Sequence, residues 1–101
     1  MVKDIQFNKV NEFYESTFTA EGNKMSIFLV LDPGSDSDNS VIVRLYTSPD
    51  GEDFADRGVI ISKLGCKGLV KEDIGLAGVL IGQHIKLVSN SEVTKGKVLY
   101  E

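Results

Sequence analysis

Apolar and polar residues alternate with a period of two along most of this chain. In the segment that begins at Met25, the residues Met25, Ile27, Leu29 and Leu31 fall on one side of an extended strand. A period of two places successive side chains on opposite faces of a strand. The residues between them are also largely apolar, which is typical of a strand covered on both faces. The segment is therefore predicted to be a buried β-strand.

A second strong segment begins at Ser40 and is dominated by β-branched and aromatic residues, which favour strands. Weaker alternation predicts strands in other parts of the chain. These are Phe13 to Ala20, Phe54 to Ser62, Ala77 to Ile81, Gln83 to Asn90 and Val93 to Tyr100. With an opening strand from Lys3 to Lys9, the pattern predicts about seven or eight short strands.

Turn-forming residues separate these segments. They are Glu21-Gly22-Asn23, Asp32 to Ser40, Ser48-Pro49-Asp50-Gly51, Gly65 to Gly68 and Ser89-Asn90-Ser91. In the third of them Pro49 pre-sets the first central torsion and Gly51 permits a positive φ, so a tight hairpin turn is expected. Short strands broken by such turns predict an all-β fold, an antiparallel β-sandwich or jelly roll, with a small barrel as the alternative.

Only one segment competes as a helix. From Val70 to Leu80 some apolar residues recur at helical spacing, but Gly75 and Gly78 would each cost about 1 kcal/mol in a helix interior. We expect a loop that leads into a strand, with at most one helical turn.

The length of 101 residues fits one domain, and 42% apolar residues with 26% charged residues is ordinary globular composition. A single β-sandwich domain over residues 1–101 is predicted. Two hypotheses stay open for residues 1–10: the opening strand, or an arm over Val2 to Phe7 that becomes ordered on a partner.

Charge excludes two classes of partner. The chain has 11 Lys and Arg against 15 Asp and Glu, a net charge of -4, which disfavours binding to nucleic acid or to an anionic membrane. The longest uncharged apolar stretch, Ile74 to Gln83, is about half of a bilayer span. The first residues lack the apolar run of an export signal, so synthesis without export is expected.

Residues for catalysis or cofactor binding are sparse. Cys66 is the lone cysteine and His84 the lone histidine, and neither has neighbours at the spacing of a zinc site or a catalytic triad. Gly75, Gly78 and Gly82 lack the Lys-Ser/Thr pair of a phosphate-binding loop. No catalytic residue, metal or cofactor is predicted.

Two acidic segments are candidate sites. The run Asp32 to Ser40, with Asp36 and Asp38 two apart, offers a weak cation site as the alternative to a solvated loop, although it lacks the Gly and Glu of a helical-hand calcium loop. A second group crowds the hairpin region and is interpreted as a charged turn, because nothing near it would tune one carboxyl for acid catalysis. It consists of Asp50, Glu52, Asp53 and Asp56.

Candidate contact residues come from apolar and aromatic positions. The segment Gly75 to Ile85 is more apolar than one sheet face requires, and any part left exposed predicts a subunit contact. The residues predicted to bind a partner are Leu80, His84, Tyr100 and Tyr46.

Two segments together form a sequence pattern, or cadence: a strand ends in a Ser-x-Asp-Gly turn, an aromatic residue follows, and a later strand carries Ile-Lys-Leu. They are Val43 to Gly58 and Gly75 to Asn90. With this cadence the chain resembles small β-sandwich virion proteins of tailed bacteriophages, capsid decoration or cement proteins above all. The resemblance implies a non-catalytic protein of the virion, made in the host cytoplasm, that forms a homo-oligomer, with a trimer favoured. Its partners would be the major capsid protein or other virion subunits.

The same cadence is similar to that of discoidin-type and other carbohydrate-binding sandwiches, with Phe54 where those domains carry Trp. That likeness implies a glycan-binding module with Tyr46, Asp50 and Phe54 at the ligand face. A receptor-binding or tail-associated virion domain and a small hydrolase that uses acids near Asp53 are the remaining alternatives.

Overall fold

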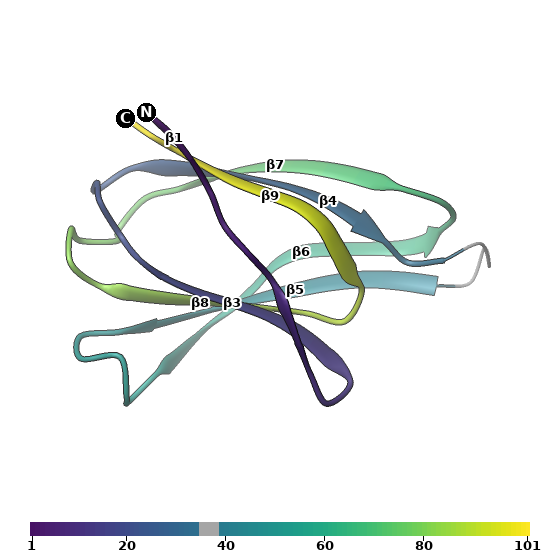
Figure 1. Ribbon diagram of the computed structural model, residues 1–101, viewed down its shortest axis with the longest axis horizontal. Helices are drawn as coiled ribbons and strands as arrows, with labels where there is room; N and C mark the ends of the chain where they lie inside the picture. The colour runs from purple at the N-terminus through teal and green to yellow at the C-terminus, as the bar shows by residue number, and fades with distance from the viewer. Residues whose placement is uncertain (35–38) are drawn as a thin grey trace.

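The computed structural model describes residues 1–34 and 39–101, which form two antiparallel β-sheets packed face to face (Figure 1). The strands in these residues are β1 (Val2–Asp4), β2 (Asn8–Val10), β3 (Phe13–Thr19), β4 (Met25–Asp32), β5 (Asn39–Ser48), β6 (Ala55–Cys66), β7 (Val70–Leu76), β8 (His84–Ser89) and β9 (Glu92–Tyr100). The described part of the chain contains no helix, and so none that could span a membrane. The predicted all-β sandwich is confirmed, with nine strands in the described residues.

The strand order follows a jelly-roll path. One sheet has the order β1-β9-β4-β7 and the other β2-β3-β8-β5-β6. After the β2–β3 hairpin the chain changes sheet at nearly every connection, and only β5 and β6 pair as neighbours along the chain within one sheet. Apart from the short β2, this gives two four-stranded layers of interleaved strands, as in jelly rolls.

The inward positions of both sheets form one contiguous apolar core. Met25, Ile27, Leu29 and Leu31 all point into it, as their alternation predicts, and each is buried. The opposing layer contributes residues of β5 and β8 at the same period. These are Val41, Val43, Leu45, Ile85 and Leu87.

The first ten residues belong to the folded domain and do not form an arm. β1 pairs with β9 in one sheet and β2 pairs with β3 in the other, so the intervening residues 5–7 cross from layer to layer (Figure 1). Ile5 is buried in the core, and its N–H donates to the carbonyl of Gly96 at 3.0 Å. The crossing covers one open side of the sandwich with apolar side chains, which is why these residues are ordered without a partner.

The segment from Val70 to Ile81 differs from the prediction. Residues Val70–Leu76 are strand β7, paired along its whole length with β4, and Ala77 to Ile81 is a loop. Val70, Ile74 and Leu76 fall on one face at a period of two, which Glu72 interrupts. Glycines at 78 and 82 adopt φ of 83° and 94°, conformations that break a strand.

Candidate functional site

The outer face of the five-stranded sheet carries apolar residues on all five strands. Val10 pairs with Phe13 across β2 and β3, and Val88 of β8 and Val59 of β6 both pair with Arg44 of β5. We use the name sheet-face patch for five of these residues: Val10, Phe13, Ile42, Val59 and Val88. Four of them are 36–46% exposed and Val88 is half-buried. An outward face this apolar is unusual for a sandwich, in which the outer positions are normally polar.

The outer face of the other sheet is built differently. Its apolar residues on β4, Phe28 and Val30, are flanked by charged partners: Phe28 by Asp73 and Lys97, and Val30 by two lysines. Long charged side chains cover apolar surface with their aliphatic stems while their heads stay in water. Val30 is accordingly buried although it points away from the core. In the described residues, charged side chains therefore cover the middle of this outer face, and its exposed apolar residues, Val2 and Leu99, pair with each other near the end of β9.

A groove of about 500 Å³ lies over part of the sheet-face patch. Its lining combines Phe13, Ile42 and Val88 of the patch with Tyr46 and Lys86, which pair directly across β5 and β8. The Lys86 ammonium lies 4.6 Å from the ring centroid of Phe54 and 5.5 Å from that of Tyr46. These cation–π contacts hold Phe54 of the β5–β6 connection against the sheet.

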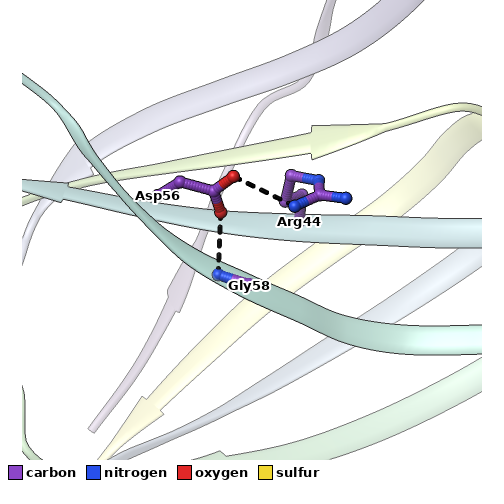
Figure 2. A network of polar contacts seen from close by, with 3 residues as sticks. All are labelled: Arg44, Asp56 and Gly58. Carbon is purple, nitrogen blue, oxygen red and sulfur yellow. Dashed lines mark hydrogen bonds and ion pairs between the residues drawn. The ribbon is translucent and has the colours of Figure 1, made fainter.

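Arg44 lies between Val88 and Val59 on this face and is fixed by an acid on the neighbouring strand. Its guanidinium donates to Asp56 Oδ2 at 3.0 Å, and the N–H of Gly58 donates to the other carboxylate oxygen at 2.8 Å (Figure 2). The pair is about half exposed, so it contributes little to stability but fixes the geometry of the face.

The turn at residues 48–51 is shaped by Asp50. Oδ1 of Asp50 accepts hydrogen bonds from the backbone N–H of Glu52 and Asp53 at 2.9 and 3.0 Å, and from the Ser48 hydroxyl at 2.8 Å. These donors favour the ionised carboxylate and lower its pKa to about 2. Gly51 has the predicted positive φ, 82°, and packs against the ring of His84. Asp50 therefore stabilises the turn through these hydrogen bonds, in agreement with the interpretation of this acidic group as a charged turn.

The lowered pKa of Asp50 predicts a specific acid response. A carboxylate whose pKa is lower in the folded chain stabilises the fold above its ordinary value of 3.8, and that contribution is lost as the pH falls towards 2. Carboxyl NMR should show Asp50 titrating near 2. The stability advantage of the wild type over Asp50→Asn should be constant above about pH 5 and shrink below pH 4. A titration midpoint near 3.8 would contradict this account.

The four residues predicted to bind a partner are not brought to one place. Tyr46 lies half-buried on the outer face of the five-stranded sheet, and His84 begins β8 on that same face, where it contacts the turn at Gly51. Leu80 lies in the loop 77–83 and is 64% exposed, as is its neighbour Ile81. The apolar segment Gly75 to Ile85 therefore does leave apolar residues exposed, which is the condition under which the sequence predicts a subunit contact.

Tyr100 does not lie on the surface, as its predicted contact with a partner requires. Its side chain is 6% exposed and belongs to the core, and its hydroxyl donates to the carbonyl of Thr19 at 3.4 Å. Burial raises the pKa of this phenol above its usual value. β9 places Val98 and Tyr100 inward and Leu99 outward, so Tyr100 does not project from the surface as predicted, and it meets solvent only as part of the lining of a groove at the end of β9.

Groups that would hold a metal are absent from residues 1–34 and 39–101: no three His, Cys, Asp or Glu side chains converge there. Asp36 and Asp38 of the proposed cation loop lie outside the described residues. Asp32 Oδ1 accepts a hydrogen bond from the Gly34 N–H at 3.0 Å.

Cys66 is buried at the end of β6 as a free thiol. In the described residues every buried side-chain nitrogen and oxygen has a hydrogen-bond partner.

Sequence reasoning missed most of the sheet-face patch. The sequence pattern assigns Ile42 and Val59 to strands, but exposure of their side chains to solvent was not predicted from it. Around Val41 to Tyr46 both faces of the strand are partly apolar, and this indicates either a covered outer face or a binding face. Distinguishing the two requires knowing which residues flank Ile42 on the neighbouring strands.

Comparisons with known proteins add little. No family model matches the chain, and no curated protein matches it. Among the solved structures that match is a family GH115 4-O-methyl-α-glucuronidase with specificity for decorated arabinogalactans, at 11% identity and a TM-score of 0.46. The match covers 99% of this chain and 14% of that one. A likeness this distant assigns neither a family nor a function.

Proposed function

We propose that this chain is a non-catalytic structural protein of a bacteriophage particle, of the capsid decoration type, which binds shell subunits through the sheet-face patch. The observation that carries the proposal is the open apolar surface across all five strands of one sheet. Soluble domains seldom leave such a surface without a partner. The resemblance of the segments 43–58 and 75–90 to decoration proteins supports the choice of partner.

The electrostatics of the patch favour a protein partner. Arg44 is neutralised by Asp56, and the other charges that line the groove, Lys86 held by two rings and Glu15, are of opposite sign, so the face combines apolar surface with balanced charge. Protein interfaces are depleted of charge at their centre and enriched in aromatic residues and Arg. Jelly rolls build both viral shells and lectins, so the fold permits this role without deciding it.

The mechanism would be additive. One sandwich of this size presents an interface of moderate area, and such an interface alone gives modest affinity. Many copies bound to adjacent shell subunits act together, because each contact raises the effective concentration for the next. A shell decorated in this way resists expansion through the sum of weak contacts.

The test uses particles of the phage or prophage whose genome encodes the chain. Mass spectrometry of purified particles should detect the chain, and undecorated shells should bind it on co-sedimentation. Ile42→Asp and Phe13→Asp should each weaken binding by roughly 30-fold or more, since burying an apolar side chain is worth about 1.5–3 kcal/mol and a buried carboxylate adds a further cost.

Leu69→Asp is the matched control, because Leu69 is exposed in the β6–β7 connection, away from the patch. It should bind as the wild type does, and the thermal unfolding of all three variants should show that the fold is retained. Absence of the chain from particles, or wild-type binding by both patch variants, overturns the proposal.

A glycan-binding module is the second candidate, favoured by the groove. Tyr46 and Phe13 offer aromatic rings, and Lys86 and Glu15 offer polar groups beside them. The same experiment separates the two functions. Retardation of the wild-type chain in polysaccharide affinity gels, lost in Tyr46→Ala and combined with no binding to particles, would favour the glycan.

A further inference from the structure

The loop 77–83 between β7 and β8 is uncharged, and hydrogen bonds within the chain fix its conformation. The N–H of Leu80 donates to Gln83 Oε1 at 2.8 Å, and the N–H of Gln83 returns to the Leu80 carbonyl at 3.0 Å. The N–H of Ile81 donates to Asn23 Oδ1 at 2.9 Å. Val79 is buried as an anchor. The loop is thus ordered before any partner binds.

This rigid loop presents two large aliphatic side chains to solvent. Leu80 and Ile81 are adjacent and equally exposed, and no charged residue lies within the loop. We call this pair the loop knob. Residues that are held in place before binding lose little conformational entropy on association, so they contribute efficiently to an interface.

An apolar groove of about 450 Å³ adjoins the start of this loop. Its lining includes Met25, Leu76, Ala77 and Leu99, and Gly75, where an added Cβ would meet nothing within 4 Å. A volume of this order is typical of sites that enclose small apolar groups. The charged residues in the lining are one cation, Lys24, and one anion, Glu101.

The knob and the groove belong to the same end of the molecule. Ala77 lines the groove and is also the first residue of the loop. Lys24 lines the groove and directly follows Asn23, whose side chain accepts from Ile81. A protruding apolar pair therefore stands next to an apolar recess on one surface.

We propose that two copies of this chain associate through this surface as a two-fold dimer, each placing Leu80 and Ile81 in the groove of the other. A two-fold interface needs a surface that complements itself, and an adjacent knob and groove meet that need. Lys24 and Glu101 are neighbours in the groove lining, where the Glu101 N–H donates to the Lys24 carbonyl at 3.3 Å, so their opposite charges balance and the groove suits an uncharged apolar occupant such as Leu80 and Ile81. The dimer lies beyond the proposed function, because it uses a surface other than the sheet-face patch.

Sedimentation equilibrium of the full chain, from about 5 to 500 μM, tests the dimer. The wild type should dimerise, and Leu80→Asp should raise the dimer Kd by about 100-fold or more, since it places a carboxylate in an apolar recess. Gly75→Leu should do the same by filling the groove, although it leaves the knob intact.

Leu69→Asp is again the control and should dimerise as the wild type does. A monomer at all concentrations, a trimer, or a dimer that survives both Leu80→Asp and Gly75→Leu overturns the proposal. A monomer whose binding to particles depends on Leu80 also overturns it and assigns the knob to a shell subunit. Failure of the patch variants to affect particle binding tests the proposed function alone, because those variants leave this surface intact.

Discussion

Leu29→Ala should lower the free energy of unfolding by about 2–5 kcal/mol, the range for removing a large aliphatic side chain from a packed core. Leu29 is fully buried in the middle of β4, between β7 and β9. Its partner on β9 is Gly96, which has no side chain to move into the space that alanine would leave. The cavity should therefore persist, which places the cost towards the upper part of the range.

Urea denaturation measures this loss, and thermal unfolding should show a Tm lower by about 4–8 °C for each kcal/mol. Leu64→Ala is the matched control, because Leu64 is 84% exposed on β6. It should change stability by no more than about 0.5 kcal/mol. Equal effects of the two substitutions would mean that β4 does not form the centre of the core.

Gly96→Ala should destabilise the fold by about 1–3 kcal/mol through overpacking. A Cβ at this position would lie 2.9 Å from Cγ1 of Ile5 and 3.2 Å from its carbonyl oxygen. Residues 5–7 cross between the sheets at this point, so the absent side chain makes room for the crossing. The added methyl group would push β1 and the crossing segment away from β9.

Gly75→Ala is the control for Gly96→Ala. Gly75 also lies within a strand, but an added Cβ there meets open space, so alanine should stabilise the fold by about 0.5–1 kcal/mol. In an Ile5→Ala background the cost of Gly96→Ala should shrink, and a double-mutant cycle measures that coupling. Equal effects of Gly96→Ala and Gly75→Ala would show that the crossing segment does not pack on β9.

Prediction from the sequence was most successful where strand period and turn chemistry agreed. The segments that begin at Met25 and Ser40 were both expected as strands, and a turn with a positive φ at Gly51 was expected too. The β5–β6 connection, residues 49–54, is longer than the tight hairpin turn that was predicted. Prediction failed at residues 70–81, where Gly75 and Gly78 indicate a loop although the apolar residues before and around them lie at a period of two. Local pattern alone could not show that β7 pairs with β4, and this pairing is what makes Val70–Leu76 a strand.

The candidate surfaces were predicted in part. Leu80 was chosen because an uncharged apolar segment exceeds what one sheet face can bury, and the loop exposes it. Tyr100 was chosen because an amphipathic ring suits an interface, but its side chain is packed in the core. Alternation shows that Leu99 and Tyr100 point in opposite directions, and it does not show which direction is inward.

The sequence by itself determined that this chain is an all-β domain of short strands and turns, since a period of two and well-placed turn residues act over a few neighbouring positions. The tertiary structure alone decided which outer face is apolar. Val30 is covered because lysines flank it on both neighbouring strands, whereas Ile42 has no such cover. Such neighbours are distant along the chain, and pairing register fixes them, so the binding surfaces become visible only after the strands are assembled.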